Sequence, residues 1–254
     1  MDIQILLILI IFGFLAAFID SVVGGGGLIS IPALLATGMP PSMALGTNKL
    51  ASSFGSFTSA ISFIRSRKVD FNIVAKLFPL SFILSIIGAF VATKLPPEYL
   101  KPLAIIMLSL VLIYTLFKKD WGDISTYQKL TRKKLILFIV IIGLIGFYDG
   151  FLGGGTGSFL LFVFLIIGFD FLSAAGNAKV LNFASNLGAL LLFIVLGQVN
   201  FAYGLSMGAA MIAGSYVGSQ FAIRKGVSYV KVLFVCVTVL LIGKNIFDYI
   251  KEYL

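Results

Sequence analysis

The sequence predicts an all-α integral membrane protein, and three features support this fold class: its composition, its long apolar runs and an internal repeat. Of 254 residues, 59% are hydrophobic and 11% are charged, whereas a soluble domain carries about 25% charged residues. Runs such as Ile3–Phe18 and Phe78–Val91 are almost entirely apolar. Backbone in lipid must be paired within helices or closed barrels, and barrel strands alternate apolar and polar residues. Because these runs are apolar on every face, we expect membrane helices.

The internal repeat is visible as a motif of one aspartate, three other residues and three glycines. The motif consists of Asp20, Gly24, Gly25 and Gly26 in the first half and of Asp149, Gly153, Gly154 and Gly155 in the second. The offset in residue number between the two motifs, 149 − 20 = 129, also maps Asn48 onto Asn177. One insertion then changes the offset to 130, which maps Val69 onto Val199. We predict two membrane repeats, 1–117 and 135–254, joined by a basic cytoplasmic linker, 118–134.

Each repeat is expected to contain a helix that ends at the glycine motif, a short helix and three longer helices. In the first repeat these are Ile3–Ile19, Leu28–Ala36, a helix from the Pro40-Pro41 pair to Ile64, Ile73–Ala92 and Tyr99–Phe117. In the second they are Leu135–Gly150, Ser158–Ile167, Phe171–Leu196, Ala202–Ile223 and Tyr229–Ile250. The short helices cannot span the bilayer, because a crossing takes about 20 residues. Proline is well suited to the first turn of the helix that follows.

The basic residues predict how the two repeats are oriented. Arg65–Lys68 and the linker, which holds six lysines and arginines, are expected on the cytoplasmic side. The counterpart of Arg65–Lys68 in the second repeat carries no charge, whereas the counterpart of Lys94 is Arg224. The basic end has therefore changed sides. This predicts an inverted second repeat and two extracytoplasmic termini.

Other classes of function are not supported by the residues present. The chain has no histidine and one cysteine, Cys236, which excludes a three-histidine metal site and a disulfide framework. There is no P-loop, dinucleotide fingerprint or Gly-x-Ser-x-Gly, and Ser228–Lys231 matches only the short Ser-x-x-Lys pattern. We expect no enzyme activity, cofactor or metal. Since the basic clusters flank apolar helices, we also expect no nucleic-acid partner.

The two glycine motifs are the first candidate substrate site. Each glycine costs a helix about 1 kcal/mol relative to alanine, and non-helical backbone at membrane depth survives only inside protein or beside a water-filled cavity. Broken helices at matching positions of inverted repeats indicate a transporter's binding site. The short helix after each break would direct free N–H groups at that site, which favours anions. The alternative is close helix packing through small residues.

A second candidate group is polar and lies near the start of the helix after each short helix. It comprises Thr47, Asn48 and Lys49 in the first repeat and Asn177 and Lys179 in the second. Amides donate hydrogen bonds to oxyanions, and ammonium groups supply positive charge. The alternative for the lysines is snorkelling to the interface. With the offset of the glycine motifs, Lys49 aligns with Ala178 rather than with Lys179.

Asp20 and Asp149 are the acids most deeply embedded in apolar sequence. Acids inside membrane segments are costly and are functional hypotheses by default. Three roles stay open for them: coupling protons to transport, pairing with a lysine, or capping the short helix that follows. Their identical spacing to the glycines favours capping.

Three segments resemble the TauE/SafE sulfite exporter family: FIDSVVGGGGLISIP (18–32), ALGTNKLASSFGS (44–56) and GFLGGGTGSF (150–159). The similarity covers nearly the whole chain and includes its two-half layout. It implies a plasma-membrane transporter that moves sulfite, sulfoacetate or related small sulfur-containing anions. The second repeat departs from the family pattern, because Thr47 has no counterpart in Gly176-Asn177-Ala178.

These features predict a secondary transporter of small sulfur-containing or related anions, sulfite-like or organosulfonate-like, in the plasma (inner) membrane. It would work by alternating access around a midplane site between the inverted repeats. One alternative is an anion channel, and another, from a different class, is a non-transport membrane protein or intramembrane enzyme. Without an ATP-binding motif, the driving force is expected from an ion gradient, the substrate gradient or a separate subunit.

Overall fold

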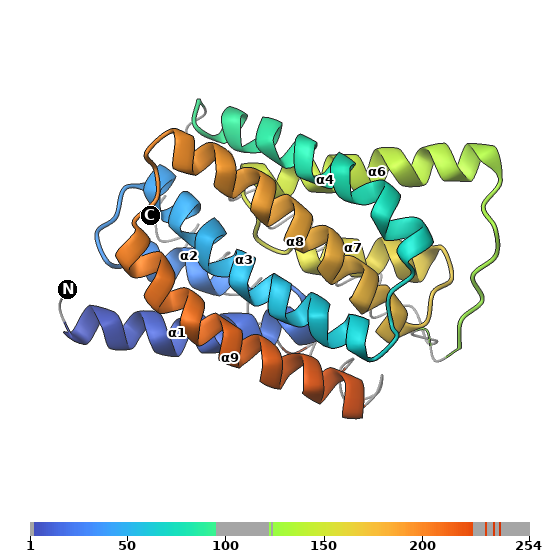
Figure 1. The fold of residues 1–254 in the computed structure, drawn as a ribbon, viewed down its shortest axis with the longest axis horizontal. Helices are drawn as coiled ribbons and strands as arrows, with labels where there is room; N and C mark the ends of the chain where they lie inside the picture. Colours follow the sequence, from blue (N-terminus) through green and yellow to red (C-terminus); the bar gives the residue numbers. More distant parts are fainter. Residues whose placement is uncertain are drawn as a thin grey trace.

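The structure is a computed structural model that describes residues 3–94, 122 and 124–225, together with the isolated positions 232, 236 and 239. In this part of the chain all regular secondary structure is α-helical (Figure 1). The helices are α1 (Ile3–Val23), α2 (Gly27–Leu35), α3 (Pro41–Arg65), α4 (Phe71–Ala92), α6 (Arg132–Phe151), α7 (Thr156–Ile166), α8 (Phe171–Val195) and α9 (Phe201–Lys225). The helices expected at Tyr99–Phe117 and Tyr229–Ile250 lie outside the described residues.

Local sequence signals set several helix ends. The carboxylate of Asp70 accepts the N–H of Asn72 at the start of α4, and that of Asp170 accepts the N–H of Ser173 at the start of α8. Such caps satisfy backbone donors that have no partner inside the helix. Helix α6 starts at Arg132, slightly before the expected boundary at Leu135. The last residues of the predicted linker therefore form the first turn of a helix.

The same order of helices occurs twice among the described residues, and it refines the register of the repeat. The starts of α2 and α7 differ in residue number by 156 − 27 = 129, whereas those of α3 and α8 differ by 171 − 41 = 130. Helices α3 and α8 are both 25 residues long. The insertion consequently lies between the glycine motif and α3 or α8, earlier in the chain than the sequence comparison placed it. With the offset of 130, Lys49 corresponds to Lys179 and Thr47 corresponds to Asn177.

The two central helices, α3 and α8, pack against each other in opposite directions. A Cβ added to Gly46 would lie 2.9 Å from the Cβ of Phe193, and one added to Gly176 would lie 3.2 Å from the Cβ of Phe63. The start of each helix therefore meets the end of the other, as the central pair in Figure 1 shows. Equivalent helices that run antiparallel are the arrangement expected of inverted repeats.

The outer helices exchange partners between the halves: α1 packs on α9, and α6 packs on α4. Both contacts are close because glycine faces the partner's backbone. A Cβ on Gly218 would come within 2.5 Å of the carbonyl oxygen of Phe18, and one on Gly150 would overlap the carbonyl oxygen of Ser85. Small residues allow membrane helices to approach in this way. The two halves are thus interleaved rather than side by side.

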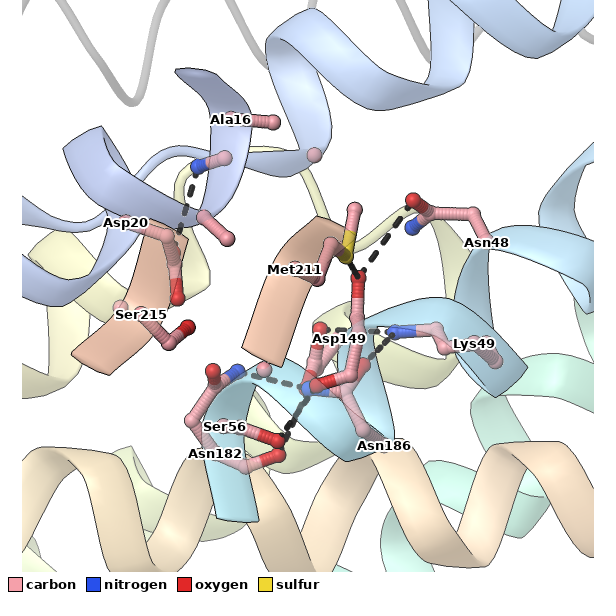
Figure 2. Close-up of a pocket in the computed structure, with 17 residues that line it drawn as sticks. Ala16, Asp20, Asn48, Lys49, Ser56, Asp149, Asn182, Asn186, Met211 and Ser215 are labelled. Carbon is pink, nitrogen blue, oxygen red and sulfur yellow. Dashed lines mark hydrogen bonds and ion pairs between the residues drawn. The ribbon is translucent and has the colours of Figure 1, made fainter. Parts of the chain in front are cut away.

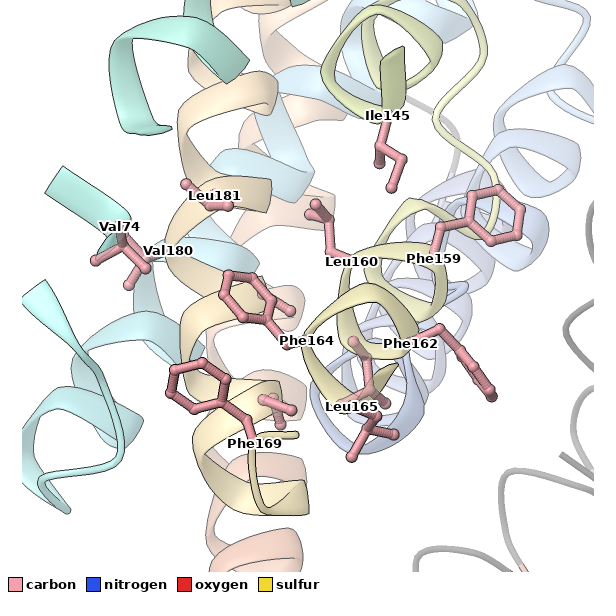
Figure 3. Packing of buried hydrophobic residues seen from close by; sticks show 14 of the residues in the cluster. Val74, Ile145, Phe159, Leu160, Phe162, Phe164, Leu165, Phe169, Val180 and Leu181 are labelled. Atoms are coloured by element: carbon pink, nitrogen blue, oxygen red, sulfur yellow. The ribbon is translucent and has the colours of Figure 1, made fainter. Parts of the chain in front are cut away.

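Apolar residues form both the interior and the outer surface. Helix α7 is enclosed by aromatic and aliphatic side chains, and its Phe164 is fully buried against Phe138 and Phe169 (Figure 3). Helices α1, α4, α6 and α8 are each long and apolar enough to cross a membrane. Side chains such as Leu7 and Leu144 are more than half exposed, which suits contact with lipid chains. The described residues thus confirm the predicted all-α membrane fold.

Candidate functional site

The two glycine breaks meet at the centre of the molecule. Gly24 and Gly153 each have a φ of 83°, a backbone conformation that glycine adopts without steric cost. A Cβ on Gly24 would overlap the backbone nitrogen of Ser158, which follows the other break. The hydroxyl of Ser158 also donates to the carbonyl oxygen of Val23 at 2.8 Å. The breaks therefore hold each other through backbone contact, and this contact requires glycine.

Two ion pairs connect the halves crosswise. The ammonium of Lys49 on α3 lies 2.8 Å from the carboxylate of Asp149 on α6. The ammonium of Lys179 on α8 lies 2.7 Å from the carboxylate of Asp20 on α1. Each pair thus joins a lysine of one half to the aspartate of the other. Neither lysine snorkels to the membrane surface, since their side chains are 1% and 3% exposed.

Asp149 is fully enclosed and well supplied with donors. Besides Lys49, its carboxylate accepts from the side-chain amide of Asn182 at 3.2 Å and from the hydroxyl of Ser185. The same ammonium of Lys49 donates to the side-chain oxygen of Asn186 at 3.2 Å. A buried ion pair is stable only when such hydrogen bonds satisfy its remaining polar atoms. The Lys49–Asp149 pair meets that condition.

Asp20 is more open and has fewer partners. Its side chain is 22% exposed, and besides Lys179 it accepts only the backbone N–H of Gly26, at 3.2 Å, among the contacts described. The residues on α3 that correspond to Asn182 and Ser185 are Ser52 and Gly55, because the two helices start at equivalent positions. Neither of these donates to Asp20 in the described part of the chain. The two ion pairs are therefore equivalent in topology and unequal in environment.

A small cavity lies beside Asp20, where α1, α3, α6, α8 and α9 meet the two breaks (Figure 2). About 20 Å³ of the cavity is open to the centre of a water molecule, which is room for about one water molecule. The polar side chains that line it are Asp20, Asn48, Lys49, Ser52, Ser56, Asp149, Asn182, Asn186 and Ser215, with Gly26 and Gly153 from the breaks and Met211 as an apolar neighbour. In this structure the site is narrow, although Asp20 in its wall is 22% exposed.

Asn48 presents a donor to this cavity. Its side-chain oxygen accepts hydrogen bonds from the hydroxyl of Ser30 at 2.6 Å and from that of Ser52 at 3.4 Å. Because the oxygen is occupied, the amide nitrogen is the atom left to bind a ligand. No described residue accepts a hydrogen bond from that nitrogen.

Thr47 and Asn177 lie away from the cavity and brace the loops between the halves. The hydroxyl of Thr47 accepts the backbone N–H of Asn200 at 2.9 Å, and the side-chain oxygen of Asn177 accepts the backbone N–H of Asp70 at 2.8 Å. No described residue accepts a hydrogen bond from the buried side-chain nitrogen of Asn177. The two residues thus perform the same structural task in the two halves, as their equivalent positions on α3 and α8 imply.

The six glycines of the motifs divide into two groups. Gly26 and Gly153 line the cavity. The remaining four shape or pack the breaks and do not line the cavity: Gly24, Gly25, Gly154 and Gly155. Gly154, for example, packs closely against the side chain of Leu28.

The expected capping role is only partly visible. Neither α2 nor α7 has a side-chain hydrogen bond from its N-cap residue, Gly26 or Gly155. Asp20 reaches the N–H of Gly26, whereas the contacts described for Asp149 are with side chains. Both carboxylates form an ion pair with a lysine, which is one of the three roles that the sequence left open.

The sequence reasoning missed several polar residues of the site. These are Ser52, Ser56, Asn182, Ser185, Asn186 and Ser215. A helical spacing could have indicated some of them, since Asn48, Ser52 and Ser56 recur every fourth position on α3 and share one face. Among the described residues no group of three acidic, histidine or cysteine side chains could hold a metal ion.

Comparisons with known proteins identify membrane transporters as relatives of the chain. The family model described as "Sulfite exporter TauE/SafE" matches residues 9–245. The chain is 38% identical over 239 residues to a "Probable membrane transporter protein" of Sinorhizobium sp., covering 94% of this chain and 91% of that one. It is 37% identical over 251 residues to one of Haemophilus influenzae, covering 98% of both chains. It is 35% identical over 235 residues to "Probable membrane transporter protein YfcA" of Escherichia coli, covering 92% of this chain and 87% of that one.

No solved structure matches the chain. The family assignment therefore comes from sequence, and the helical, membrane-spanning architecture agrees with it. The match extends over both halves and includes both glycine motifs. The protein is a membrane transporter, and the chain belongs to the TauE/SafE sulfite exporter family.

Proposed function

We propose that the protein carries a small sulfur-containing or related anion, sulfite-like or organosulfonate-like, and binds it in the cavity between Asp20 and Asn48. The observation that carries the proposal is a cavity between two glycine breaks inside a membrane fold, lined by Lys49, by the carboxylate that Lys179 pairs with, and by the amide of Asn48, which donates to no described residue. Interrupted helices in facing repeats are where transporters of this kind hold their substrates.

The donors around the cavity suit an oxyanion. An anion taken from water loses its hydration, and charge-assisted hydrogen bonds of about 1.5–3 kcal/mol each offset that loss. The amide of Asn48 can supply one such bond, and the N–H of Gly26 can supply a second when the anion takes the place of the carboxylate of Asp20. The four charged groups sum to zero, since two lysines face two aspartates. A bound anion must therefore compete with a carboxylate for an ammonium.

Alternating access fits the small volume of the cavity. A space of about 20 Å³ holds about one water molecule, so the site would have to widen before an anion could enter it. The interleaved packing of α1 with α9 and of α6 with α4 supplies two interfaces along which the halves could move. The alternative anion channel would conduct without exchange, and an intramembrane enzyme would do neither.

Transport by purified protein in liposomes tests the proposal. Vesicles loaded with sulfite should take up labelled sulfite from outside by counterflow. Counterflow without electrical conductance supports a carrier, whereas conductance without counterflow supports the channel. Vesicles that show neither with sulfite, sulfate or a sulfonate would contradict the proposal.

Replacing Asn48 with alanine should weaken anion binding about 10-fold or more, because one donor of about 1.5–3 kcal/mol is lost from the site. Sulfite binding to the purified protein measures the effect. Asn177→Ala is the matched control, since that amide braces a loop outside the cavity. It should lower thermal stability and leave the affinity unchanged. Equal losses of affinity in both variants would place the anion elsewhere.

The inverted topology gives a second expected result. In a background without Cys236, a cysteine at Ser125 should react with an impermeant thiol reagent only after the cells are opened. A cysteine added at the C-terminus should react in intact cells. The prediction rests on the basic residues near Arg65 and Arg132, which are expected in the cytoplasm. A C-terminal cysteine that reacts only after lysis would overturn this orientation.

A further inference from the structure

The two lysine–aspartate pairs differ in a way that bears on how transport is driven. Asp149 is 1% exposed and accepts from an ammonium, an amide and a hydroxyl. Asp20 is 22% exposed, borders the cavity and accepts from Lys179 and one backbone N–H. Both carboxylates line the cavity, but Asp20 is the more exposed of the two, and fewer hydrogen bonds must be broken there when a proton binds.

We propose that Asp20 is a proton-binding site and that the proton it takes up is the coupling ion for the anion. This inference rests on the proposed function and extends it. When a proton binds a carboxylate oxygen of Asp20, the carboxyl group becomes neutral and its ion pair with Lys179 is broken. The ammonium of Lys179 keeps its own protons and is left without its counter-ion next to the cavity, where its positive charge attracts the anion. The only covalent change is the transfer of a proton from water to the carboxylate oxygen.

The charges of the site balance in this scheme. Lys49, Lys179, Asp20 and Asp149 together carry no net charge when all are ionised. One proton on Asp20 makes the site positive by one charge, which cancels the charge of a monovalent anion and half the charge of sulfate. Without the proton any anion would make a small cavity inside the membrane fold more negative, which is costly. The proton and the anion therefore bind most favourably together.

Each element packed around Asp20 supplies neutral groups or one of these four charges. Helix α8 contributes Lys179, the N-cap of α2 contributes the N–H of Gly26, and α3 contributes Lys49 to the same cavity. Helix α6 contributes Asp149, which Lys49 holds, and α9 contributes neutral residues. Among the described residues only Lys179 forms an ion pair with Asp20, so the state of Asp20 controls a single ammonium.

Sulfate binding to the purified protein tests this, because sulfate keeps its charge from neutral to mildly acidic pH, whereas sulfite does not. The anion prefers the protonated site, so affinity should rise as pH falls. One linked proton gives at most about a 10-fold change per pH unit. Asp20→Asn, which mimics the neutral carboxyl, should bind sulfate tightly with no dependence on pH. Asp170→Asn, which keeps an N-cap outside the cavity, should behave as the wild type.

Proteoliposomes that contain a pH-sensitive dye give a second measurement on the unaltered protein. An inward sulfate gradient should carry protons inward, and a sodium gradient should have no effect. Asp20→Asn should exchange sulfate without moving protons, and Asp20→Glu should restore proton movement. Sulfate transport by the wild type with sodium dependence or without protons would overturn the proton site and leave the anion transporter standing. A wild type that neither binds nor moves sulfate or sulfite would overturn the proposed function itself.

Discussion

Lys49→Met should be among the most destabilising single substitutions in this protein. It leaves the carboxylate of Asp149 buried without its cation, and removing one partner of a buried ion pair costs about 3–5 kcal/mol. The same change at Lys179 should cost less, because Asp20 is 22% exposed and the cavity can hydrate it. Thermal unfolding of the purified variants in detergent compares the two directly.

A double substitution separates the ion pair from other effects of Lys49. Lys49→Met combined with Asp149→Leu removes both charges, and replacing a buried pair with apolar residues is often neutral or stabilising. The double variant should therefore recover most of the stability lost by Lys49→Met and should still fail to transport. Equal destabilisation by the two lysine variants would show that the two pairs do not differ in environment as described. No recovery in the double variant would show that Lys49 stabilises the fold through contacts other than its ion pair with Asp149.

Gly24→Ala should abolish folding or transport, whereas Gly38→Ala should not. Both glycines have nearly the same φ, 83° and 82°, and a left-handed conformation costs a non-glycine residue about 1–2 kcal/mol. A Cβ on Gly24 would also overlap the backbone of Ser158, whereas a Cβ on Gly38 would meet nothing within 4 Å. The difference between the two variants therefore measures the contact between the glycine breaks.

Yield of folded protein, thermal stability and sulfite counterflow give the readout for this pair. Gly38→Ala should lose only the cost of its backbone conformation and keep its transport activity. Similar behaviour of the two variants would mean that the breaks can separate without consequence. A glycine at a helix contact, such as Gly214 on α9, would not serve as the control in place of Gly38. A Cβ at Gly214 would overlap the carbonyl oxygen of Phe14, so the substitution would destabilise the protein through helix packing alone.

The position of the repeat insertion shows why the site could not be fully predicted. The sequence match between Asn48 and Asn177 suggested equivalent ligands, yet α3 starts at Pro41 and α8 at Phe171. Counted from these starts, Asn177 takes the place of Thr47 and braces a loop, while Asn48 alone reaches the cavity. A shift of one position turns a helical side chain by about 100°, so a small alignment difference changes which face a residue occupies.

The fold class, the two broken helices and the family could all be predicted from the chain, because they depend on composition and on spacing between neighbouring residues. Apolar runs need helices in lipid, and glycine runs interrupt them. The use of the charges, by contrast, depends on how the helices pack. Lys49 and Asp149 are 100 positions apart in the chain, and Lys179 and Asp20 are 159 apart. Such pairs form only when antiparallel α3 and α8 bring each lysine to the opposite half, and no local pattern encodes that contact.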